Sequence, residues 1–137
     1  MLSGKENMNE LIRDYLTDIK ETTYQEVYDL YNNYEMKDIE HYRNAFDSIY
    51  LLKHDDLINL VADWADGKLV PTFKFMAIYD NKYIAADNED NEFFMEEYKN
   101  IEKAILYLNS SIEVEILNNN DLETCIKILE QEDELTL

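Results

Sequence analysis

The stretch TFKFMAIYDNKYIAAD, residues 72–87, decides the fold that we expect for this chain. Its two halves, residues 72–79 and 82–87, are rich in the aromatic and β-branched residues that favour strands. Between the halves stand Asp80 and Asn81, two residue types that tolerate a positive φ angle and therefore suit a tight turn. We therefore predict an antiparallel hairpin over these residues.

The segment after the hairpin predicts one more strand of the same sheet. A polar turn at residues 88–91 leads into EFFMEEY, residues 92–98, which predicts a third strand and so a meander. Alternate side chains of a strand point to opposite faces, so either Phe93 and Met95 or Phe94 should enter the core.

Three further elements are expected toward the end of the chain. NIEKAILYL, residues 100–108, predicts a short helix capped by Asn100. SIEVEIL, residues 111–117, alternates apolar and polar residues and predicts a half-buried strand with its β-branched residues inward. NNNDLETCIKILEQ, residues 118–131, predicts a final helix.

The first half of the chain predicts four helices. Apolar residues recur at helical spacing over residues 6–20 and again over residues 39–50. Between these segments, Thr23 stands three residues before a glutamate, which is a capping box that starts a second helix. A fourth helix is expected from a cap at Asp55 to a stop at Gly67.

Together these elements predict an α+β fold, in which N-terminal helices precede a mostly antiparallel sheet of about four strands with two further helices. The length of 137 residues fits one domain over residues 1–137. Within it we expect a helical part over residues 1–67, a mixed β/α part over residues 68–131 and a frayed acidic tail over residues 132–137.

The chain is strongly acidic throughout. Its 31 acidic and 12 basic residues give a formal net charge of 12 − 31 = −19, whereas small domains commonly carry magnitudes of roughly 2 to 8. The surplus is spread, with 5 − 11 = −6 over residues 1–50, 5 − 11 = −6 over residues 51–100 and 2 − 9 = −7 over residues 101–137. An aromatic content of 12% and regular apolar spacing argue against disorder.

The charge and the cysteine content bound the partners and the compartment. Such a surface repels DNA, RNA and anionic lipid and attracts basic surfaces, so we expect no direct nucleic-acid binding and no membrane partner. The single cysteine, Cys125, lies on an apolar helix face, where we expect it to pack in the core. The absence of a disulfide pair and of a secretory or membrane-spanning segment favours the cytoplasm.

Motifs for catalysis are missing from the sequence. His41 and His54 belong to no metal or nucleophile pattern, and the two glycines, Gly4 and Gly67, cannot build a phosphate-binding loop. The acidic stretch at residues 87–97 lacks the central glycine of a calcium loop. We therefore expect no enzyme, no catalytic residue, no metal and no cofactor.

A carboxylate-dependent hydrolase remains an alternative. Asp55, Asp56, Asp63 and Asp66 could crowd on one helix near His54 and supply a general acid and base. With 31 acidic residues in the chain, such clusters also arise by chance.

The tyrosines offer a second clue. Tyr24, Tyr28, Tyr31 and Tyr34 lie in one short predicted helix, so they cannot all face the core. Exposed tyrosine favours interfaces because it offers a large area at low entropy cost. Core packing and partner contact are both open for these side chains.

The predicted first helix carries a row of like charges. Glu6, Glu10, Asp14 and Asp18 recur every four residues, and each such pair costs about 0.2–0.5 kcal/mol. Carboxylates one helical turn apart, about 6 Å, or two strand residues apart, about 7 Å, have a spacing comparable to the charges of a phosphate backbone. The row is either a solvated face or a mimic of nucleic acid.

In size, charge and composition the chain resembles the small, very acidic phage and plasmid proteins that inhibit host defence nucleases, the anti-CRISPR and anti-restriction proteins. By local pattern, residues 79–108 are similar to a hairpin-then-helix unit in small accessory proteins of Firmicutes mobile elements, and residues 23–34 have a similar composition. The resemblance implies a non-enzymatic inhibitor in the cytoplasm of a bacterial host. It implies as partner a basic nucleic-acid-binding protein, a Cas nuclease or its guide-RNA complex.

Two acidic surfaces are the candidates for this contact, with an exposed aromatic residue as apolar anchor. The expected partner-binding residues are Glu6, Glu10, Asp14, Asp18, Asp87, Glu89, Asp90, Glu92, Phe94, Glu96 and Glu97. The other interpretation of residues 87–92 is a turn that is acidic because turns favour Asp and Asn. An acidic adaptor or antitoxin-like protein of one basic partner is the main functional alternative.

Overall fold

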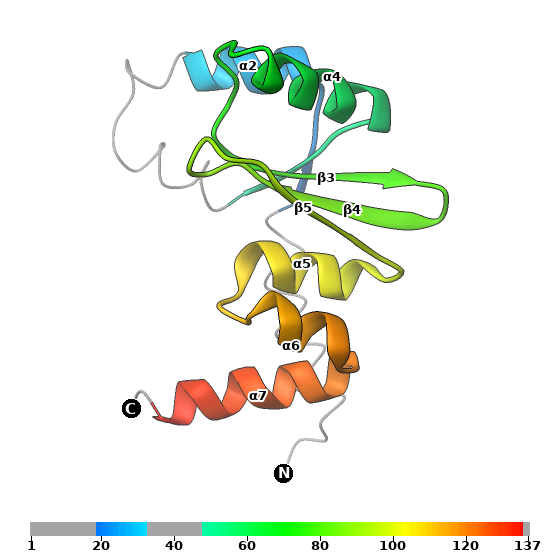
Figure 1. Ribbon diagram of the computed structural model, residues 1–137, viewed down its shortest axis with the longest axis vertical. Helices are drawn as coiled ribbons and strands as arrows, with labels where there is room; N and C mark the ends of the chain where they lie inside the picture. The colour runs from blue at the N-terminus through cyan, green and yellow to red at the C-terminus, as the bar shows by residue number, and fades with distance from the viewer. Residues whose placement is uncertain (1–18, 33–47, 136–137) are drawn as a thin grey trace.

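The computed structural model describes residues 19–32 and 48–135, with side chains described to residue 131. The strands are β1 (Ile19–Glu21), β2 (Ile49–Leu51), β3 (Lys74–Tyr79), β4 (Lys82–Asp87) and β5 (Phe94–Tyr98), and the helices are α2 (Tyr24–Asn32), α4 (His54–Ala65), α5 (Ile101–Asn109), α6 (Val114–Asn119) and α7 (Leu122–Leu135). Figure 1 shows them in layers, with α2 and α4 on one face of the sheet, α5 on the other, and α6 and α7 stacked beyond α5.

The sheet has five strands in the order β1-β2-β3-β4-β5. β1, β2 and β3 run parallel, whereas β3, β4 and β5 form an antiparallel meander. The predicted α+β fold and the meander are confirmed, but the sheet is mixed and has five strands rather than about four. Since β1 and β2 lie within residues 1–67, the part expected to be purely helical also supplies strands.

The two parallel strands replace the ends of two predicted helices. Ile19 lies in β1, and Ile49 and Tyr50 lie in β2, so helices expected to reach these residues are wrong there. Ile49 and Tyr50 are both buried, as is typical of a parallel strand covered on both faces. Three residues are too few for strand alternation to be told from helical spacing. The remainder of both predicted helices lies outside the described residues.

The hairpin forms as the sequence predicts. Asp80 and Asn81 have φ angles of 53° and 59°, and the flanking residues Tyr79 and Lys82 are paired across the two strands. Two positive φ angles in a two-residue loop define the type I′ turn, whose twist matches that of the strands.

Predicted helix caps are confirmed at two places. The Thr23 hydroxyl accepts a hydrogen bond from the backbone N–H of Glu26 at 3.2 Å, which begins α2. The Asn100 side chain accepts from the backbone N–H of Lys103 at 2.9 Å, which begins α5. Each cap satisfies a backbone donor that the first helical turn leaves free.

The start of α4 differs from the prediction. The residue before the helix is Lys53, whose side chain makes no capping hydrogen bond, so the predicted cap at Asp55 is wrong. Asp55 instead lies in the first turn, where the helix dipole favours a carboxylate. The end is as predicted, because Gly67 adopts a φ angle of +79° and donates its backbone N–H to the Trp64 carbonyl at 3.0 Å.

The segment expected as a strand at residues 111–117 is wrong, because it forms α6. Ile112 and Leu117 are buried in the core and Ile116 packs against it, whereas Val114 is exposed. Alternation over so few residues fits a short helix as well as a strand. The final helix, α7, continues to Leu135 rather than ending at residue 131, so the backbone expected to fray is helical there.

Two cores lie on opposite faces of the sheet, because consecutive strand residues point to opposite sides. The α4-side core contains Val27, Tyr50, Leu52, Leu57, Leu60, Val70, Phe73, Phe75, Ala77 and Ala86. The α5-side core contains Ile49, Met76, Ala85, Tyr98, Ala104, Ile105, Leu106, Leu108, Ile112, Leu117, Cys125 and Ile126. The expected core position of Cys125 is confirmed, and burial raises the pKa of its thiol.

Candidate interaction surface

The acidic turn, residues 87–93, is fixed to the body of the protein by its backbone and its asparagines. Asn88 is fully buried, donates its backbone N–H to the Phe73 carbonyl at 3.1 Å and donates its side-chain amide to the Pro71 carbonyl at 2.9 Å. Trp64 donates its indole N–H to the Asn91 carbonyl at 2.8 Å. The carboxylates of the turn therefore project from a defined backbone.

Four carboxylates at this turn differ in their surroundings. Asp87 accepts a hydrogen bond from the backbone N–H of Glu89 at 3.0 Å. Glu89 lies 3.5 Å from the Lys74 ammonium, yet burial raises the pKa of Glu89, and Asp87 and Asp90 add to that rise while Lys74 opposes it. Asp90 and Glu92 are exposed and pair with no cation among the described residues.

The pleat of β5 divides the predicted binding residues between the two faces of the sheet. Met95 and Glu97 are paired with Ala86 and Ile84 of β4, which belong to the α4-side core, so they lie on that face. Phe94 and Glu96 are paired with Asp87 and Ala85, so they fall on the α5 face, although Glu96 also borders a groove beside α4. The predicted residues of β5 therefore form no single row.

The apolar residues beside the turn settle the alternative left open by the sequence. Phe93 packs into the α4-side core, with its ring 5.3 Å from that of Trp64. Phe94 is 55% exposed and Met95 is 46% exposed. Of the two alternatives, Phe93 inward with Phe94 outward is found, but Met95 does not follow Phe93 into the core, because β5 is the last strand of the sheet while α4 packs mainly over β3. Phe94 is available as an apolar contact.

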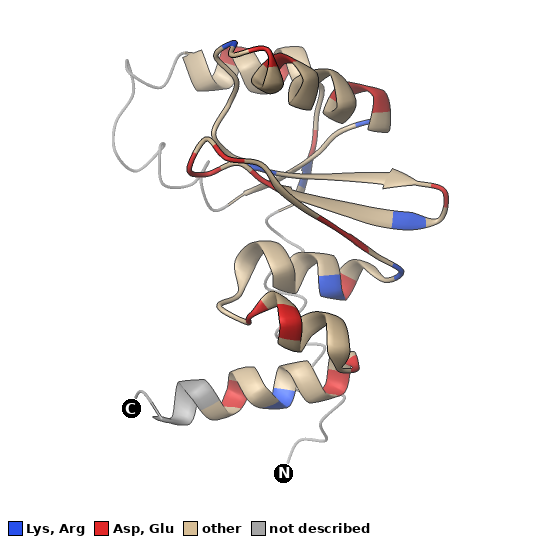
Figure 2. Ribbon diagram, viewed as in Figure 1, with Lys and Arg blue, Asp and Glu red and all other residues tan. Residues whose placement is uncertain are grey.

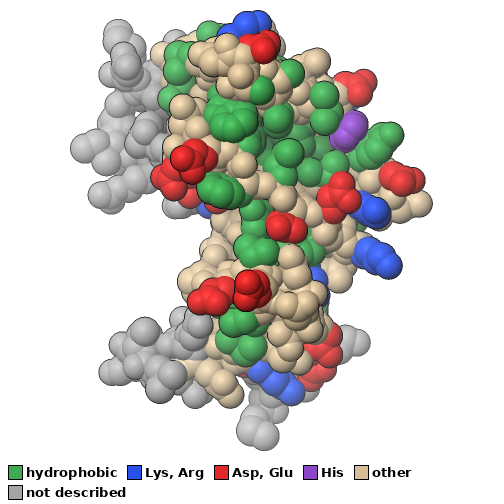
Figure 3. All heavy atoms as spheres, in the orientation of Figure 1, with side chains coloured by type: hydrophobic (Ala, Val, Ile, Leu, Met, Phe, Trp, Pro, Cys, Tyr) green, Lys and Arg blue, Asp and Glu red, His purple; other side chains and the backbone are tan. Residues whose placement is uncertain are grey.

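An apolar groove lies between α4 and β5. It is about 530 Å³ in volume and is lined by His54, Leu57, Ile58, Ile84, Met95, Glu96 and Glu97. Ile58 is 51% exposed, and His54 stacks on Tyr79 with ring centroids 3.9 Å apart. Figure 3 shows hydrophobic side chains gathered on this face with carboxylates among them. Ile58 is not part of the apolar helix face formed by residues 57, 60, 61 and 64. This spacing is the sequence signal that could have indicated its exposure.

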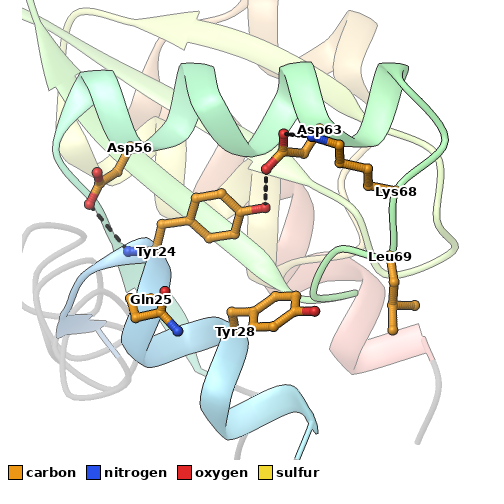
Figure 4. A pocket seen from close by; sticks show the side chains of 7 residues that line it. All are labelled: Tyr24, Gln25, Tyr28, Asp56, Asp63, Lys68 and Leu69. Carbon is orange, nitrogen blue, oxygen red and sulfur yellow. Dashed lines mark hydrogen bonds and ion pairs between the residues drawn. The ribbon is translucent and has the colours of Figure 1, made fainter.

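A second cavity, of about 560 Å³, lies between α2 and α4 (Figure 4). Its lining residues are Tyr24, Gln25, Tyr28, Asp56, Asp63, Lys68 and Leu69. The Tyr24 hydroxyl donates to Asp63 at 2.8 Å, and Lys68 lies 3.3 Å from the other oxygen of that carboxylate. The hydrogen bond from Tyr24 and the charge of Lys68 lower the pKa of Asp63, while burial and Asp63 raise the pKa of Tyr24.

Two of the four aspartates suggested for a hydrolase line one cavity, whereas the histidine suggested with them lies elsewhere. Asp56 and Asp63 line the α2–α4 cavity, whereas His54 lines the groove beside β5. Asp56 accepts a hydrogen bond from the backbone N–H of Tyr24 at 3.2 Å. Both oxygens of Asp63 are held by Tyr24 and Lys68, so this carboxylate serves the contact between the two helices.

Two lysines donate hydrogen bonds within the fold, and no sequence pattern indicates this role. Lys74 is buried and donates to the Asn109 side chain at 2.8 Å. Lys103 donates to the carbonyls of Leu117 and Asn120 at 2.9 and 2.6 Å, at the end of α6. Over residues 19–32 and 48–131 the formal charge is 8 − 20 = −12, and the carboxylates are spread over helices, strands and loops (Figure 2). Internal use of two cations leaves the surface more acidic than this sum.

The remaining sequence features are the N-terminal acidic row, the last tyrosine of the cluster, a metal site and a membrane span. Glu6, Glu10, Asp14 and Asp18 lie outside the described residues, as does Tyr34. Within the described part of the chain, no group of three or more His, Cys, Asp or Glu residues could hold a metal ion. No helix in that part is long and apolar enough to cross a membrane.

Comparison with family models, with curated proteins and with solved structures found no match. The assignment of function therefore depends on the residues and their geometry.

Proposed function

We propose that this protein is a non-enzymatic inhibitor of a host nucleic-acid-processing defence system, most concretely a CRISPR–Cas effector nuclease. It acts by occupying a basic nucleic-acid groove with an acidic surface that stands in for DNA or RNA. The observation that carries the proposal is the pair of exposed carboxylates, Asp90 and Glu92, which stand on a fixed turn without an ion-pair partner among the described residues, in a fold that uses two of its lysines internally.

The acidic turn has the properties that such a contact needs. Asp90 and Glu92 are exposed and unpaired among the described residues, so their charge is available to Lys and Arg of a groove. Their backbone is held by Asn88 and Trp64, so little conformational entropy is lost on binding. Phe94 follows directly and supplies an exposed apolar anchor.

The net charge determines how such a complex responds to salt. A surface of this sign is drawn to a basic groove with an association rate that falls steeply as ionic strength rises. Because the complex uses the same cations as the nucleic acid, DNA or guide RNA should compete with the protein for the groove.

The experiment is capture of partners from bacterial lysate on the immobilised protein at low and at moderate salt, followed by challenge with DNA or guide RNA. The proposal predicts retention of a basic nuclease or its guide-RNA complex, with less retained at moderate salt and release by nucleic acid. Retention of a non-basic partner, or of no partner at either salt concentration, would contradict it.

An acidic adaptor of one basic protein is the second candidate, and the apolar groove beside β5 favours it. A surface that only mimics phosphates has little use for the exposed side chains of Ile58 and Met95. For an adaptor, the retained partner would be basic but would not be released by DNA or RNA. The genes near the coding sequence also separate the two candidates, because an inhibitor should lie among phage or plasmid genes.

A further inference from the structure

Strand β5 ends the sheet with an edge that no other described strand covers. The sheet order places it last, and among the described strands its partner is β4 alone. In an antiparallel pair the backbone N–H and C=O groups of alternate residues point away from the partner strand. β5 therefore presents the backbone groups with which a further extended segment can pair.

The two faces beside this edge differ in chemistry. On the α4 face lies the apolar groove, with Met95 and Ile58 46% and 51% exposed. Two acids line this groove: Glu97 is paired with Lys82 at 3.6 Å, and Glu96 borders the groove from the strand itself. Alternate side chains of an added strand would enter this groove, so those side chains should be apolar.

The α5 face beside the same edge carries the acid Glu96 next to the exposed ring of Phe94. Glu96 makes no ion pair with any described residue and lies 3.5 Å from the side-chain amide of Asn118. Burial raises the pKa of the Tyr107 phenol to about 12, and the negative charges of Asp87 and Glu96 add to this rise. The other alternate side chains of an added strand would face this negative charge, so they should be basic.

We propose that the β5 edge binds an extended segment of a partner protein in which apolar and basic residues alternate. The segment adds as a sixth strand, with its apolar side chains in the groove between α4 and β5 and its Lys or Arg side chains toward Glu96. This goes beyond the proposed function, because it specifies a peptide-binding mode that any basic partner could use.

A second copy of this chain does not fit the edge. Registers of two β5 strands that place Glu96 or Glu97 of one copy opposite a glutamate of the other are disfavoured, because like charges across a strand pair are destabilising. Each copy also carries a net charge of −19. The same two glutamates thus oppose self-association at an open edge and favour a basic partner.

The test uses a short synthetic peptide of alternating lysine and valine, added to the full chain. Hydrogen exchange of the β5 amides should slow at least about tenfold, since the edge N–H groups become hydrogen-bonded. N-methylation of the peptide amides that would face β5 should weaken binding about tenfold, whereas a peptide of alternating glutamate and valine should not bind. Binding that is insensitive to N-methylation, slowed exchange elsewhere than in β5, or a dimer formed through β5 would overturn the proposal.

A matched pair of variants tests the groove. Ile58→Glu should weaken binding of the lysine–valine peptide about tenfold, because it places a charge where an apolar side chain should lie. Leu69→Glu is the control, since Leu69 is also exposed, at 63%, but lies beside the α2–α4 cavity. Equal binding by the two variants would overturn the proposal.

The two proposals fail in different ways. Binding of the peptide at β5 by a protein that inhibits no nuclease would support strand addition and reject the inhibitor. If the Ile58→Glu variant no longer bound the peptide but still inhibited the nuclease fully, strand addition would be rejected as the inhibitory contact. The proposed inhibitor function would still hold.

Discussion

At the scale of single residues, the internal lysines are the clearest structural requirement. Lys103 satisfies the carbonyls of Leu117 and Asn120, which α6 leaves without helical partners. Lys103→Met should lower the free energy of unfolding by about 1–3 kcal/mol, because partly buried acceptors lose a charged donor. Urea unfolding measures this loss.

The control for this change is Lys99→Met. Lys99 is exposed, and its replacement removes the same charge from the same acidic protein. The free energy of unfolding should therefore change by no more than about 0.5 kcal/mol. An equal loss of stability in both variants would show that charge alone, and not the contact with α6, is responsible.

Glu89 should give the protein a pH-dependent stability. Burial raises the pKa of this carboxyl above its ordinary value of 4.5, so the folded protein holds the proton more tightly than the unfolded chain does. Stability should therefore fall as the pH rises from about 4.5 through the raised pKa. Glu89→Gln removes the titrating group, and its stability relative to the unmodified protein should rise over that window and stay constant above it.

Urea unfolding at a series of pH values checks this prediction. Glu92→Gln is the matched control, because it removes the same charge from an exposed position in the same turn. If the difference between Glu89→Gln and the unmodified protein did not change with pH, the raised pKa of Glu89 would be contradicted.

At the scale of elements, the hairpin turn depends on two positive φ angles. Asn81→Val places a β-branched residue at a φ angle of 59° and should cost about 1–2 kcal/mol of stability. Asn81→Gly is the permissive comparison, because glycine adopts this conformation without strain. Thermal unfolding distinguishes them, and equal stability of the two variants would argue against the type I′ turn.

The elements also show how far the sequence predicts this structure. The hairpin, the meander and the caps at Thr23 and Asn100 follow from local chemistry, and all are confirmed. β1 and β2 could not be predicted, because each has three residues and is stabilised by pairing with a distant segment. α6 was missed because its short alternation suits either structure, and its end depends on Lys103 of another helix.

The candidate surface was likewise predictable only where it depends on local sequence. The exposed acids of the turn are evident from composition, since a run such as residues 87–92 cannot be buried without partners. The split of β5 between two faces depends on its register with β4, and the groove depends on α4 leaving β5 uncovered. Neither the split of β5 nor the groove can be predicted from a local sequence pattern.

At the scale of the whole molecule, the central claim is that uncompensated charge is used for binding and is not only for solvation. A net charge of −19 spread over the chain attracts any basic surface at long range, so charge alone gives association but little specificity. The acidic turn should add specificity, because its carboxylates are fixed and lie beside Phe94.

The most direct test of this claim is cleavage of target DNA by the effector nuclease retained from the lysate, with increasing amounts of two variants of equal charge. One variant carries Asp90→Lys and Glu92→Lys in the acidic turn, and the other carries Glu113→Lys and Glu115→Lys at the exposed start of α6. The turn variant should need roughly tenfold more protein for half-inhibition, about 1.4 kcal/mol, whereas the α6 variant should stay near the unmodified protein. Equal loss of inhibition in both variants, or no loss in either, would contradict a contact made through the acidic turn.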